Sequence, residues 1–409
     1  MDEVTKKNFI LINHLSGGGA ERQVSYISKL KSIDKLILLE PLITYEIPVE
    51  KTIIVSDSKN GTLIVNKIIN LFNAIKILKK IGLNRNTNLI CFLQLSYIIG
   101  FVCKILFKCK LTYCIRTNPF GFYEQYKGMK IPFFIYQYML RSADHIVCNS
   151  KTTADELNHK FNFTKAQHIP NGYDINSLNQ QAEQSLNIVE AVFHSNKVLI
   201  TAGRLLHDKG QWHLIRIFAQ LLKQNNHIKL AILGEGPLLS QLINLCHSFN
   251  LNVFDSSQNH DANENYDVYF LGFQKNPYSF IKKSYLFLMP SLYEGLPNAP
   301  IESLLVSTPC ILSDCKSGPR EILKPDSNLN NTANSIEESS YGYLLPPFNG
   351  EEIFNTSELI QEEKFWVNVI DSLLKDEIKY LKMKENTFSI NEVYDLNKVN
   401  IQWLKFLNS

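Results

Sequence analysis

The sequence predicts an α/β protein of two domains, each built on a parallel sheet wrapped by helices, with a helical tail after them. Three observations support this prediction. The chain has 409 residues, 45% of them hydrophobic, which is enough to fill two cores of roughly 150–200 residues each. Short apolar runs alternate with longer periodic segments along the chain. A polar segment near the middle separates two series of this kind.

The first series contains short apolar runs that end in polar or glycine-rich turns, a pattern that predicts buried parallel strands. The expected strands are Phe9–Asn13, Lys35–Leu39, Leu89–Gln94, Leu111–Ile115 and His145–Asn149. Residues 63–81 predict a helix, because apolar side chains recur there at alternating spacings of four and three. Polar residues and a glycine interrupt the apolar stretch 89–107, which favours a strand followed by a helix over a membrane span.

The polar segment 175–197 predicts the boundary between the domains. We expect a first Rossmann-like domain over residues 1–190, a second over 191–375, and a helical tail over 376–409 that could pack back on the first. The elements expected in the second domain are strands at Val198–Ala202, Lys229–Leu233, Val268–Leu271, Tyr285–Met289 and Cys310–Ser313, and helices at Trp212–Gln224 and Leu238–Ser248. Residues 325–340 are mainly polar and predict an exposed loop.

Charge is distributed unevenly along the chain. Residues 1–190 carry 23 Lys and Arg against 15 Asp and Glu, and the rest carry 19 against 24, although the net charge is only +3. From residue 58 to residue 123 there are ten basic residues and no acidic one. The implied partner is an anionic membrane surface, and the candidates to face it are Lys67, Lys76, Lys79, Lys80, Lys104, Lys108 and Lys110. The alternative is a helix that packs its apolar stripe on the sheet and shows its lysines to water.

The eight cysteines form no Cys-x-x-Cys pair, and several lie in apolar runs, so we expect free thiols in a reducing compartment. The chain begins Met1-Asp2-Glu3 and lacks the basic and then apolar order of a signal peptide. We therefore expect a cytoplasmic protein, with the inner face of the membrane as a candidate place of peripheral contact.

A glycine-rich turn follows the first expected strand, with the sequence Ser16-Gly17-Gly18-Gly19-Ala20-Glu21-Arg22. Glycines let backbone N–H groups approach an anion at the start of the next helix. The alternative is a dinucleotide-binding turn, since Glu40 ends the second strand. However, Arg22 stands where that motif requires its third glycine, which disfavours an oxidoreductase.

A second loop follows the strand Val198–Ala202, with the sequence Gly203-Arg204-Leu205-Leu206-His207-Asp208-Lys209-Gly210. Arg204 and Lys209 are five residues apart at a strand-to-helix corner, so both cations can converge on one diphosphate. Open α/β sheets bind ligands at this end of their strands, which favours a diphosphate site over an ordinary basic loop.

A third loop follows the strand Tyr285–Met289, with the sequence Glu294-Gly295-Leu296-Pro297-Asn298-Ala299-Pro300-Ile301-Glu302. Asn298 is expected to cap a helix whose free N–H groups could meet phosphate, and Pro300 suits the first turn. Glu294 and Glu302 are placed to accept hydrogen bonds from the hydroxyls of a sugar or ribose. The alternative is that both are surface charges.

Together these residues resemble the large family of retaining nucleotide-sugar glycosyltransferases with the GT-B fold, often numbered family four. The resemblance runs from Phe9 to about Pro346. Its further motifs are Asn149-Ser150, Ile169-Pro170-Asn171-Gly172, Leu233-Gly234-Glu235-Gly236-Pro237, Leu271-Gly272-Phe273 and Gly318-Pro319-Arg320-Glu321-Ile322. It implies two facing Rossmann-like domains with a cleft between them.

The resemblance also implies which residues carry the chemistry. Three are candidate catalytic residues: Arg204 and Lys209 would bind the donor diphosphate, and Glu294 the donor sugar. The donor-binding candidates are Gly18, Gly19, Glu235, Phe273, Gln274, Leu296, Pro297, Asn298 and Glu302. Of these, Glu302 would bind the ribose, and the loop at Phe273 would contact the base through its backbone.

On the acceptor side, many relatives carry a His near the reacting sugar. The corresponding stretch here, Tyr113-Cys114-Ile115-Arg116-Thr117-Asn118-Pro119, has no His. Arg116 and Asn118 are the alternative candidates for that polar role, and the sequence does not choose between them.

The activity implied is transfer of a hexose or N-acetylhexosamine from a nucleotide diphosphate sugar, with UDP expected. The acceptor would be a saccharide or a polyprenyl-diphosphate-linked saccharide, in the synthesis of surface polysaccharide such as capsule or O-antigen. The chain has no Asp-x-Asp, so no metal or other cofactor is expected, and fixed cations would stabilise the leaving group. Nucleic acid is not an expected partner. A non-catalytic sugar-nucleotide-binding subunit and an isomerase or phosphorylase on the same two-domain plan are the alternatives.

Overall fold

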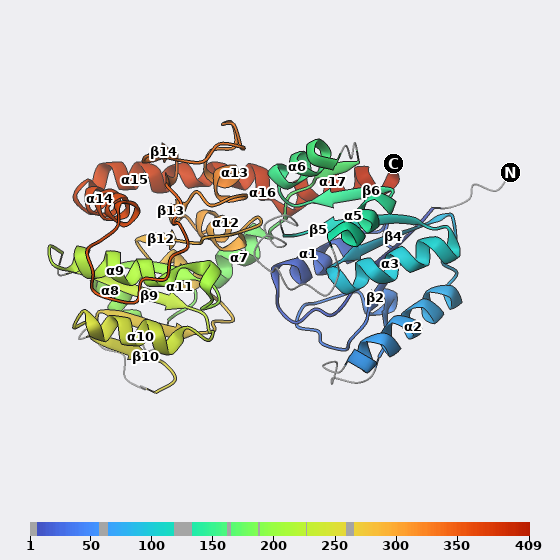
Figure 1. Cartoon of the computed structure of the whole chain (residues 1–409), viewed down its shortest axis with the longest axis horizontal. Coiled ribbons are helices and arrows are strands. Elements are labelled where there is room, and N and C mark those ends of the chain that lie inside the picture. Colours follow the sequence, from blue (N-terminus) through green and yellow to red (C-terminus); the bar gives the residue numbers. More distant parts are fainter. Residues whose placement is uncertain are drawn as a thin grey trace. The chain divides into compact units, whose positions relative to one another are not determined.

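The computed structural model describes residues 6–56, 64–117, 133–161, 165–186, 189–225, 227–258 and 266–409. The chain folds into two compact α/β units, each with its own sheet (Figure 1). Unit 1 consists of Met1–Gly172 and Val393–Ser409, and unit 2 of Tyr173–Glu392. The predicted fold class, two α/β units on parallel sheets with a helical tail, is confirmed.

The described part of unit 1 contains a sheet of seven parallel strands, in the order β3-β2-β1-β4-β5-β6-β7. The strands are β1 (Lys7–Ile12), β2 (Lys35–Leu38), β3 (Thr52–Ile54), β4 (Thr87–Phe92), β5 (Lys110–Ile115), β6 (His145–Cys148) and β7 (Ala166–His168). The central strands are apolar and buried, because helices cover both faces of the sheet.

The two faces of this sheet carry different helices. On one face lie α2 (Ile64–Lys80), α3 (Gln94–Phe107), α5 (Phe133–Ser142) and α6 (Lys151–Phe161), and on the other α1 (Gly19–Ser28) and α17 (Leu396–Asn408). Alternation along β1 explains the division: Phe9 and Leu11 join the core of the first face, and Ile10 and Ile12 that of the second. The short helix η1 (Val49–Lys51) precedes β3.

The sheet of unit 2 has the order β10-β11-β9-β8-β12-β13-β15-β14 in the described residues, and only β14 runs antiparallel to its neighbour. The strands are β8 (Lys197–Ala202), β9 (Ile228–Leu233), β10 (Val253–Asp255), β11 (Val268–Gly272), β12 (Leu286–Met289), β13 (Cys310–Ser313), β14 (Glu337–Ser339) and β15 (Gly342–Leu345). The helices among and after them are η3 (His207–Lys209), α9 (Gln211–Leu222), α10 (Leu239–Ser248), α11 (Tyr278–Lys282), α12 (Asn298–Leu305), α13 (Pro319–Leu323), α14 (Gln361–Lys375), α15 (Glu377–Asn386), η4 (Thr387–Ile390) and α16 (Asn391–Tyr394).

A buried polar cluster fastens α14 to α9. The Glu363 Oε1 atom lies 2.8 Å from His213 Nδ1 and 2.8 Å from Arg216 Nε, and all three side chains are fully buried. Burial lowers the pKa of His213 by more than the Glu363 carboxylate raises it, so the pKa lies below its ordinary value. Around the cluster, Trp212 and Trp366 belong to the largest hydrophobic core of the unit.

The polar segment 175–197, which was predicted to be the boundary between the domains, holds two short helices, α7 (Ile175–Ala182) and α8 (Glu190–Ser195). Asp174 caps α7 by accepting a 3.0 Å hydrogen bond from the backbone N–H of Ser177. Lys283, directly after α11, pairs with Glu190 at 2.8 Å. These contacts place the segment in unit 2, and the division between the units falls ahead of it, at Gly172 and Tyr173.

The prediction of an exposed loop over residues 325–340 was wrong in two respects. Its last residues form β14, which pairs with β15, and Ala333 is buried. In contrast, residues 89–107 form β4 and α3 as predicted. In the ranges that the structure describes, no helix is long and apolar enough to cross a bilayer. All eight cysteines are buried and free, as expected from their spacing.

The helical tail is divided between the units. The helices from α14 to η4 belong to unit 2, whereas α17 belongs to unit 1. Val399, Trp403 and Leu407 of α17 are buried in the same core as Ile10 and Ile12 of β1. The chain therefore passes from one unit to the other twice.

Candidate functional site

In each sheet the strand order reverses at one point, and ligands of open α/β sheets bind at the carboxyl ends of the strands there. The reversal lies between β1 and β4 in unit 1 and between β8 and β12 in unit 2. The glycine-rich turn follows β1, the Arg204 loop follows β8, and the Glu294 loop follows β12. Each of the three predicted motifs therefore lies at a switch point.

Lys209 and Glu294, which were predicted as separate donor contacts, form an ion pair across the switch point of unit 2. The Lys209 Nζ lies 2.7 Å from Glu294 Oε1, and the two side chains are only 21% and 10% exposed. Ser291 donates a second hydrogen bond of 2.7 Å to the same oxygen. Burial alone would lower the pKa of Lys209, but the Glu294 carboxylate, together with that of Asp208 at 3.6 Å, outweighs it and raises the pKa above its ordinary value.

Arg204 differs from Lys209 in being exposed. Its carbonyl oxygen accepts a 3.0 Å hydrogen bond from Gln211 Nε2, which anchors the loop. Its guanidinium makes no hydrogen bond or ion pair with any residue that the structure describes. Arg204 is therefore available to an anionic ligand as it stands, whereas Lys209 is shared with a carboxylate.

Glycines let the loops at this edge pack backbone to backbone. A Cβ atom at Gly234 would lie 2.0 Å from the carbonyl oxygen of Gly203, and one at Gly318 would lie 2.3 Å from that of Gly295. Both glycines have positive φ angles, of 128° and 93°. The loops after β8 and β9, and those after β12 and β13, are thus held in close contact that a larger residue would prevent.

The helix α12 begins at Asn298 with Pro297 in the capping position, so the prediction that Asn298 caps it was wrong. Tyr173 donates a 2.7 Å hydrogen bond to Asn298 Oδ1, and this contact uses the oxygen that a cap would need. Glu302 is buried one turn into the helix. Leu296 and Pro297 are buried too, which leaves their backbone as the part that a donor could contact.

Glu235 and Phe273 meet where β9 and β11 end. The Glu235 Oε1 atom accepts a 3.4 Å hydrogen bond from the backbone N–H of Phe273, a residue that is 66% exposed. Gln274 turns back and donates from Nε2 to the carbonyl oxygen of Leu271. The turn therefore presents an exposed aromatic ring on a backbone that is held by side chains.

In unit 1, Gly18 caps α1 and Gly19 is its first residue. A Cβ atom at Gly18 would lie 2.1 Å from Glu21 Oε2, so the Glu21 side chain fills the space beside the glycine. The other carboxylate oxygen of Glu21 is 3.9 Å from His14 Nδ1. An anionic ligand at this turn would share the helix terminus with Glu21, which the sequence analysis did not include.

Arg116, at the end of β5, is packed into unit 1. It donates a 2.9 Å hydrogen bond from Nη1 to Asn171 Oδ1, and its guanidinium lies 5.1 Å from the centroid of the Phe92 ring. Its Nε and Nη2 atoms are buried and have no hydrogen-bond partner among the described residues. Burial lowers the pKa of Arg116 below its ordinary value. Asn118, the alternative candidate, lies outside the described residues.

Comparisons with known sequences decide the family. The family model described as glycosyl transferases group 1 matches residues 187–342. An uncharacterized glycosyltransferase from Methanocaldococcus jannaschii is 33% identical over 398 residues, which cover 92% of this chain and 94% of that protein. The chain belongs to the group 1 glycosyltransferases.

Other relatives of this glycosyltransferase have more specific names. The N-acetylgalactosamine-N,N'-diacetylbacillosaminyl-diphospho-undecaprenol 4-alpha-N-acetylgalactosaminyltransferase of Campylobacter jejuni is 31% identical over 78% of this chain and 83% of its own. Among solved structures, Anabaena HepE in complex with UDP and glucose has a TM-score of 0.69 at 16% identity, over 99% of this chain and 100% of its own. Sucrose-phosphate synthase of Thermosynechococcus elongatus reaches a TM-score of 0.73 at 14% identity, over 98% of each chain. At these identities the two structures support the fold alone.

Residues that the sequence analysis did not select hold the Glu294 loop of the glycosyltransferase in place. Asp314, buried at the end of β13, accepts hydrogen bonds from Arg320 Nε at 3.0 Å and from the backbone N–H of Ala333 at 2.7 Å. Ser317, which lies between Asp314 and Arg320 in the sequence, donates a 2.8 Å hydrogen bond to the carbonyl oxygen of Glu294. The sequence signal for the Asp314–Arg320 ion pair was an Asp directly after a strand with an Arg six residues later.

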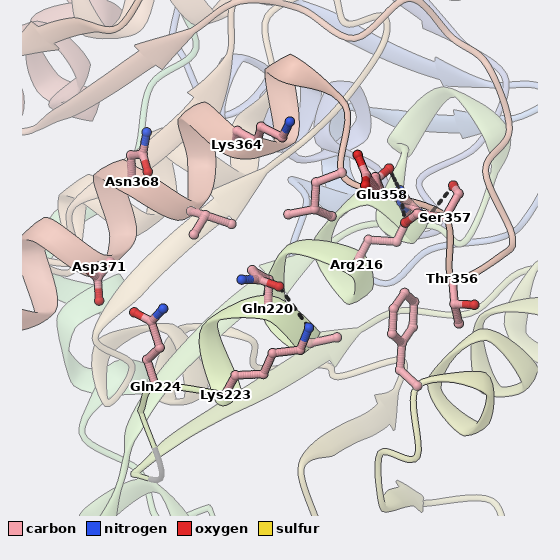
Figure 2. Close-up of a pocket in the computed structure, with 14 residues that line it drawn as sticks. Arg216, Gln220, Lys223, Gln224, Thr356, Ser357, Glu358, Lys364, Asn368 and Asp371 are labelled. Atoms are coloured by element: carbon pink, nitrogen blue, oxygen red, sulfur yellow. Dashed lines mark hydrogen bonds between the residues drawn. The ribbon is translucent and has the colours of Figure 1, made fainter.

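A separate cavity of about 550 Å³ lies between α9 and α14 of the glycosyltransferase (Figure 2). Arg216, Lys223, Lys364 and Asp371 are among its lining residues. Arg216 already donates to the carbonyl oxygens of the adjacent loop, including that of Glu358 at 2.9 Å. None of the predicted site residues lines this cavity, so it is distinct from the strand ends that carry them.

Proposed function

We propose that this glycosyltransferase is a retaining enzyme of family four that transfers a hexose or N-acetylhexosamine from a UDP-sugar. The acceptor is a saccharide or a polyprenyl-diphosphate-linked saccharide. The observation that carries the proposal is the Lys209–Glu294 pair at the switch point between β8 and β12, with the exposed Arg204 on the same loop as Lys209. Two cations can bind a diphosphate, and a carboxylate next to them can accept hydrogen bonds from the hydroxyls of the attached sugar.

In this proposal each charged group has one role. Arg204 and Lys209 bind the diphosphate, Glu294 accepts hydrogen bonds from the donor sugar, and Glu302 accepts them from the ribose. Negative charge grows on the leaving phosphate as its bond to the sugar breaks, so cations fixed in advance stabilise the transition state more than the bound donor. The contact with Glu294 orients Lys209 for this role before the donor arrives.

The proposed transfer proceeds on one face of the sugar. The acceptor hydroxyl oxygen forms a bond to C1 on the side from which the phosphate departs, and the bond from C1 to the phosphate oxygen breaks. The hydroxyl proton passes to the departing phosphate oxygen, giving the nucleoside diphosphate and the glycosylated acceptor. No protein nucleophile and no metal are assigned to the reaction.

Names among the related proteins support the choice of donor and acceptor. The Campylobacter relative is named for transfer to a diphospho-undecaprenol-linked saccharide, and HepE was crystallised with UDP and glucose. A polyprenyl-linked acceptor is presented at a bilayer surface. Cytoplasmic synthesis of surface polysaccharide, such as capsule or O-antigen, with peripheral contact to an anionic membrane, is therefore part of the proposal.

A donor and acceptor screen tests the proposal. The purified protein is incubated with UDP-, GDP- and ADP-sugars, with and without polyprenyl-diphosphate-linked saccharides, and the product anomer is assigned by NMR. We expect transfer from a UDP-hexose or UDP-N-acetylhexosamine with the donor configuration retained. An inverted product, or epimerisation or phosphorolysis in place of transfer, contradicts the proposal. Donor binding with no turnover on any acceptor would instead indicate a non-catalytic subunit.

A further inference from the structure

Three neighbouring helices of unit 1 share an unusual composition. α2, α3 and α5 pack in sequence along one face of the sheet, with contacts from α2 to α3 and from α3 to α5 (Figure 1). Not one Asp or Glu occurs in the three helices, whereas α1 and α6 of the same unit both contain acidic residues. The charged side chains that these three helices themselves contribute are therefore all positive.

Large apolar side chains project from this outer surface. Seven of them are at least 40% exposed: Ile69, Phe72, Ile105, Leu106, Phe134, Ile135 and Tyr138. The rings of Phe101 on α3 and Tyr138 on α5 lie 5.9 Å apart, which makes the apolar surface continuous between these helices. Single exposed apolar residues are common, but a group of them on adjacent helices marks an interaction surface.

On α2 the apolar and basic residues lie on one stripe. Ile69, Phe72, Lys76 and Lys80 recur at spacings of three and four, so they share one side of the helix. All four are exposed, while Leu78 on the opposite side is buried against the sheet. The helix thus has a buried apolar stripe and a second stripe that faces outward.

The other two helices repeat the arrangement. Ile105 near the end of α3 is followed by the exposed Lys108, and Phe134 and Tyr138 of α5 are followed on the same stripe by the exposed Arg141. On each helix, cations therefore follow the apolar side chains towards the carboxyl-terminal end.

Not every lysine expected on this surface belongs to it. Lys104 is half-buried and forms an ion pair of 2.6 Å with Asp144, so its charge is already balanced and we do not count it among the lipid contacts. Lys79 and Lys110 are exposed, and the side chain of Lys67 lies outside the described residues.

We propose that the outer surface of α2, α3 and α5 docks on an anionic lipid bilayer. The exposed apolar side chains enter the headgroup region, and Lys76, Lys79, Lys80, Lys108 and Arg141 meet the lipid phosphates. The absence of acidic residues from the three helices argues against a second copy as the occupant, because two such surfaces would repel each other. The proposal rests on the proposed function for the use of the docking, but the docking itself requires neither donor nor acceptor.

Vesicle co-sedimentation of the full chain tests this proposal. Vesicles of phosphatidylcholine alone are compared with vesicles that also contain phosphatidylglycerol, at low and high salt. We expect binding to the anionic vesicles that salt weakens. Phe72→Ser and Phe134→Ser should each lower the partition coefficient by about tenfold, because each removes an inserted ring. The triple variant K76E, K79E and K80E should lower it by at least about tenfold on anionic vesicles only.

Two variants of unit 1 serve as controls. Val49→Ser removes an exposed apolar side chain from η1, and Lys31→Glu reverses an exposed charge just after α1, on the other side of the sheet. Neither should change vesicle binding. Because all the substituted side chains are exposed, circular dichroism and thermal unfolding should match the unmodified protein, which separates lost docking from lost folding.

Three results would overturn the docking surface. One is equal binding to neutral and anionic vesicles at every salt concentration, and another is equal binding by Phe72→Ser and Val49→Ser. The third is a lack of vesicle binding together with a dimer, seen by analytical ultracentrifugation, that Phe72→Ser dissociates, since that would identify a contact between copies. Vesicle binding without any sugar transfer would leave the docking surface intact and contradict only the proposed function.

Discussion

Arg204 offers the cleanest test of a single residue, because it combines exposure with a position at the switch point. Arg204→Ala should lower kcat/KM by the equivalent of about 2–4 kcal/mol, as expected for a charge-assisted contact that strengthens when the phosphate leaves. The free energy of unfolding should not change, since the guanidinium has no described partner to lose. Steady-state kinetics and urea unfolding check this. Lys223→Ala, an exposed cation on the far cavity, is the control, and wild-type kinetics in Arg204→Ala would rule out the diphosphate role.

Lys209 and Glu294 should behave as a coupled pair. Among the described residues, removing Glu294 leaves the largely buried Lys209 with only the longer, 3.6 Å contact to Asp208, and removing Lys209 leaves Glu294 with only the Ser291 hydrogen bond, so Lys209→Met and Glu294→Gln should each destabilise the fold by about 1–3 kcal/mol. The double variant should be more stable than the sum of the two losses predicts, with a coupling energy of about 1–3 kcal/mol. Urea unfolding of all four proteins measures it. Simple additivity would mean that the 2.7 Å contact contributes nothing in solution.

The assignment of phosphate binding to fixed cations also predicts the response to chelators. Transfer should persist in EDTA, because Arg204 and Lys209 in this proposal neutralise the charge that a divalent ion would otherwise balance. Initial rates in EDTA, and after addition of Mg²⁺ or Mn²⁺, give the measurement. Loss of transfer in EDTA with recovery on Mn²⁺ would contradict the assignment.

At the scale of elements, the ion pair between Arg320 of α13 and Glu337 of β14 should weaken in acid. Arg320 donates to both carboxylate oxygens of Glu337, at 3.1 and 2.7 Å, and these hydrogen bonds lower the pKa of Glu337 to about 2 from its ordinary 4.5. A lowered pKa means that ionised Glu337 stabilises the fold above about pH 4.5. This contribution is lost as the pH falls from about 4.5 to about 2.

Glu337→Gln should therefore cost about 1–2 kcal/mol near neutral pH, which is less than the pKa shift alone implies because the carboxylate is partly solvated. The cost should shrink as the pH approaches 2, where the carboxyl of the unmodified protein becomes protonated. Urea unfolding across this pH range checks the prediction, with Glu358→Gln on an exposed loop as the control. A cost that stays constant with pH would show that the ion pair is not its source.

The buried strands could be predicted because parallel strands covered on both faces are continuous apolar runs. The expected strand Leu111–Ile115, for example, is observed as Lys110–Ile115. The strands β3, β7, β10 and β14 were missed, since each has three residues and mixed exposure, too short for a pattern. The buried four-residue strand β15 was missed as well. The helix α7 was missed because its composition is polar, although Asp174 carried a capping signal.

The sequence also placed the main charged residues of the site at one edge, because parallel strands of one sheet end together. It could not predict which of them touch. Lys209 and Glu294 are 85 residues apart, and Arg116 and Asn171 are 55 apart, so their contacts depend on how the loops pack. The same holds for the hydrogen bond from Tyr173 to Asn298, which joins residues 125 apart.

At the scale of the whole molecule, α17 makes the stability of unit 1 depend on the end of the chain. Trp403 is almost fully buried in the core of unit 1, so Trp403→Ala should destabilise that unit by about 3–5 kcal/mol. Hydrogen exchange followed by mass spectrometry should show lost protection in β1 and β4 and unchanged protection in β8 and β9. Ile401→Ala, exposed on the same helix, is the control. Equal loss in both units would mean that they unfold as one.

The return of the chain to unit 1 also sets the order in which the two units are completed during synthesis. Unit 2 is one continuous segment, Tyr173–Glu392, interposed between the two segments of unit 1. A ribosome that adds residues from the N-terminus finishes this segment before it makes Val393–Ser409. The unit that is begun first is therefore finished last. The face of β1 that α17 covers stays without this helix until all of unit 2 has been synthesised.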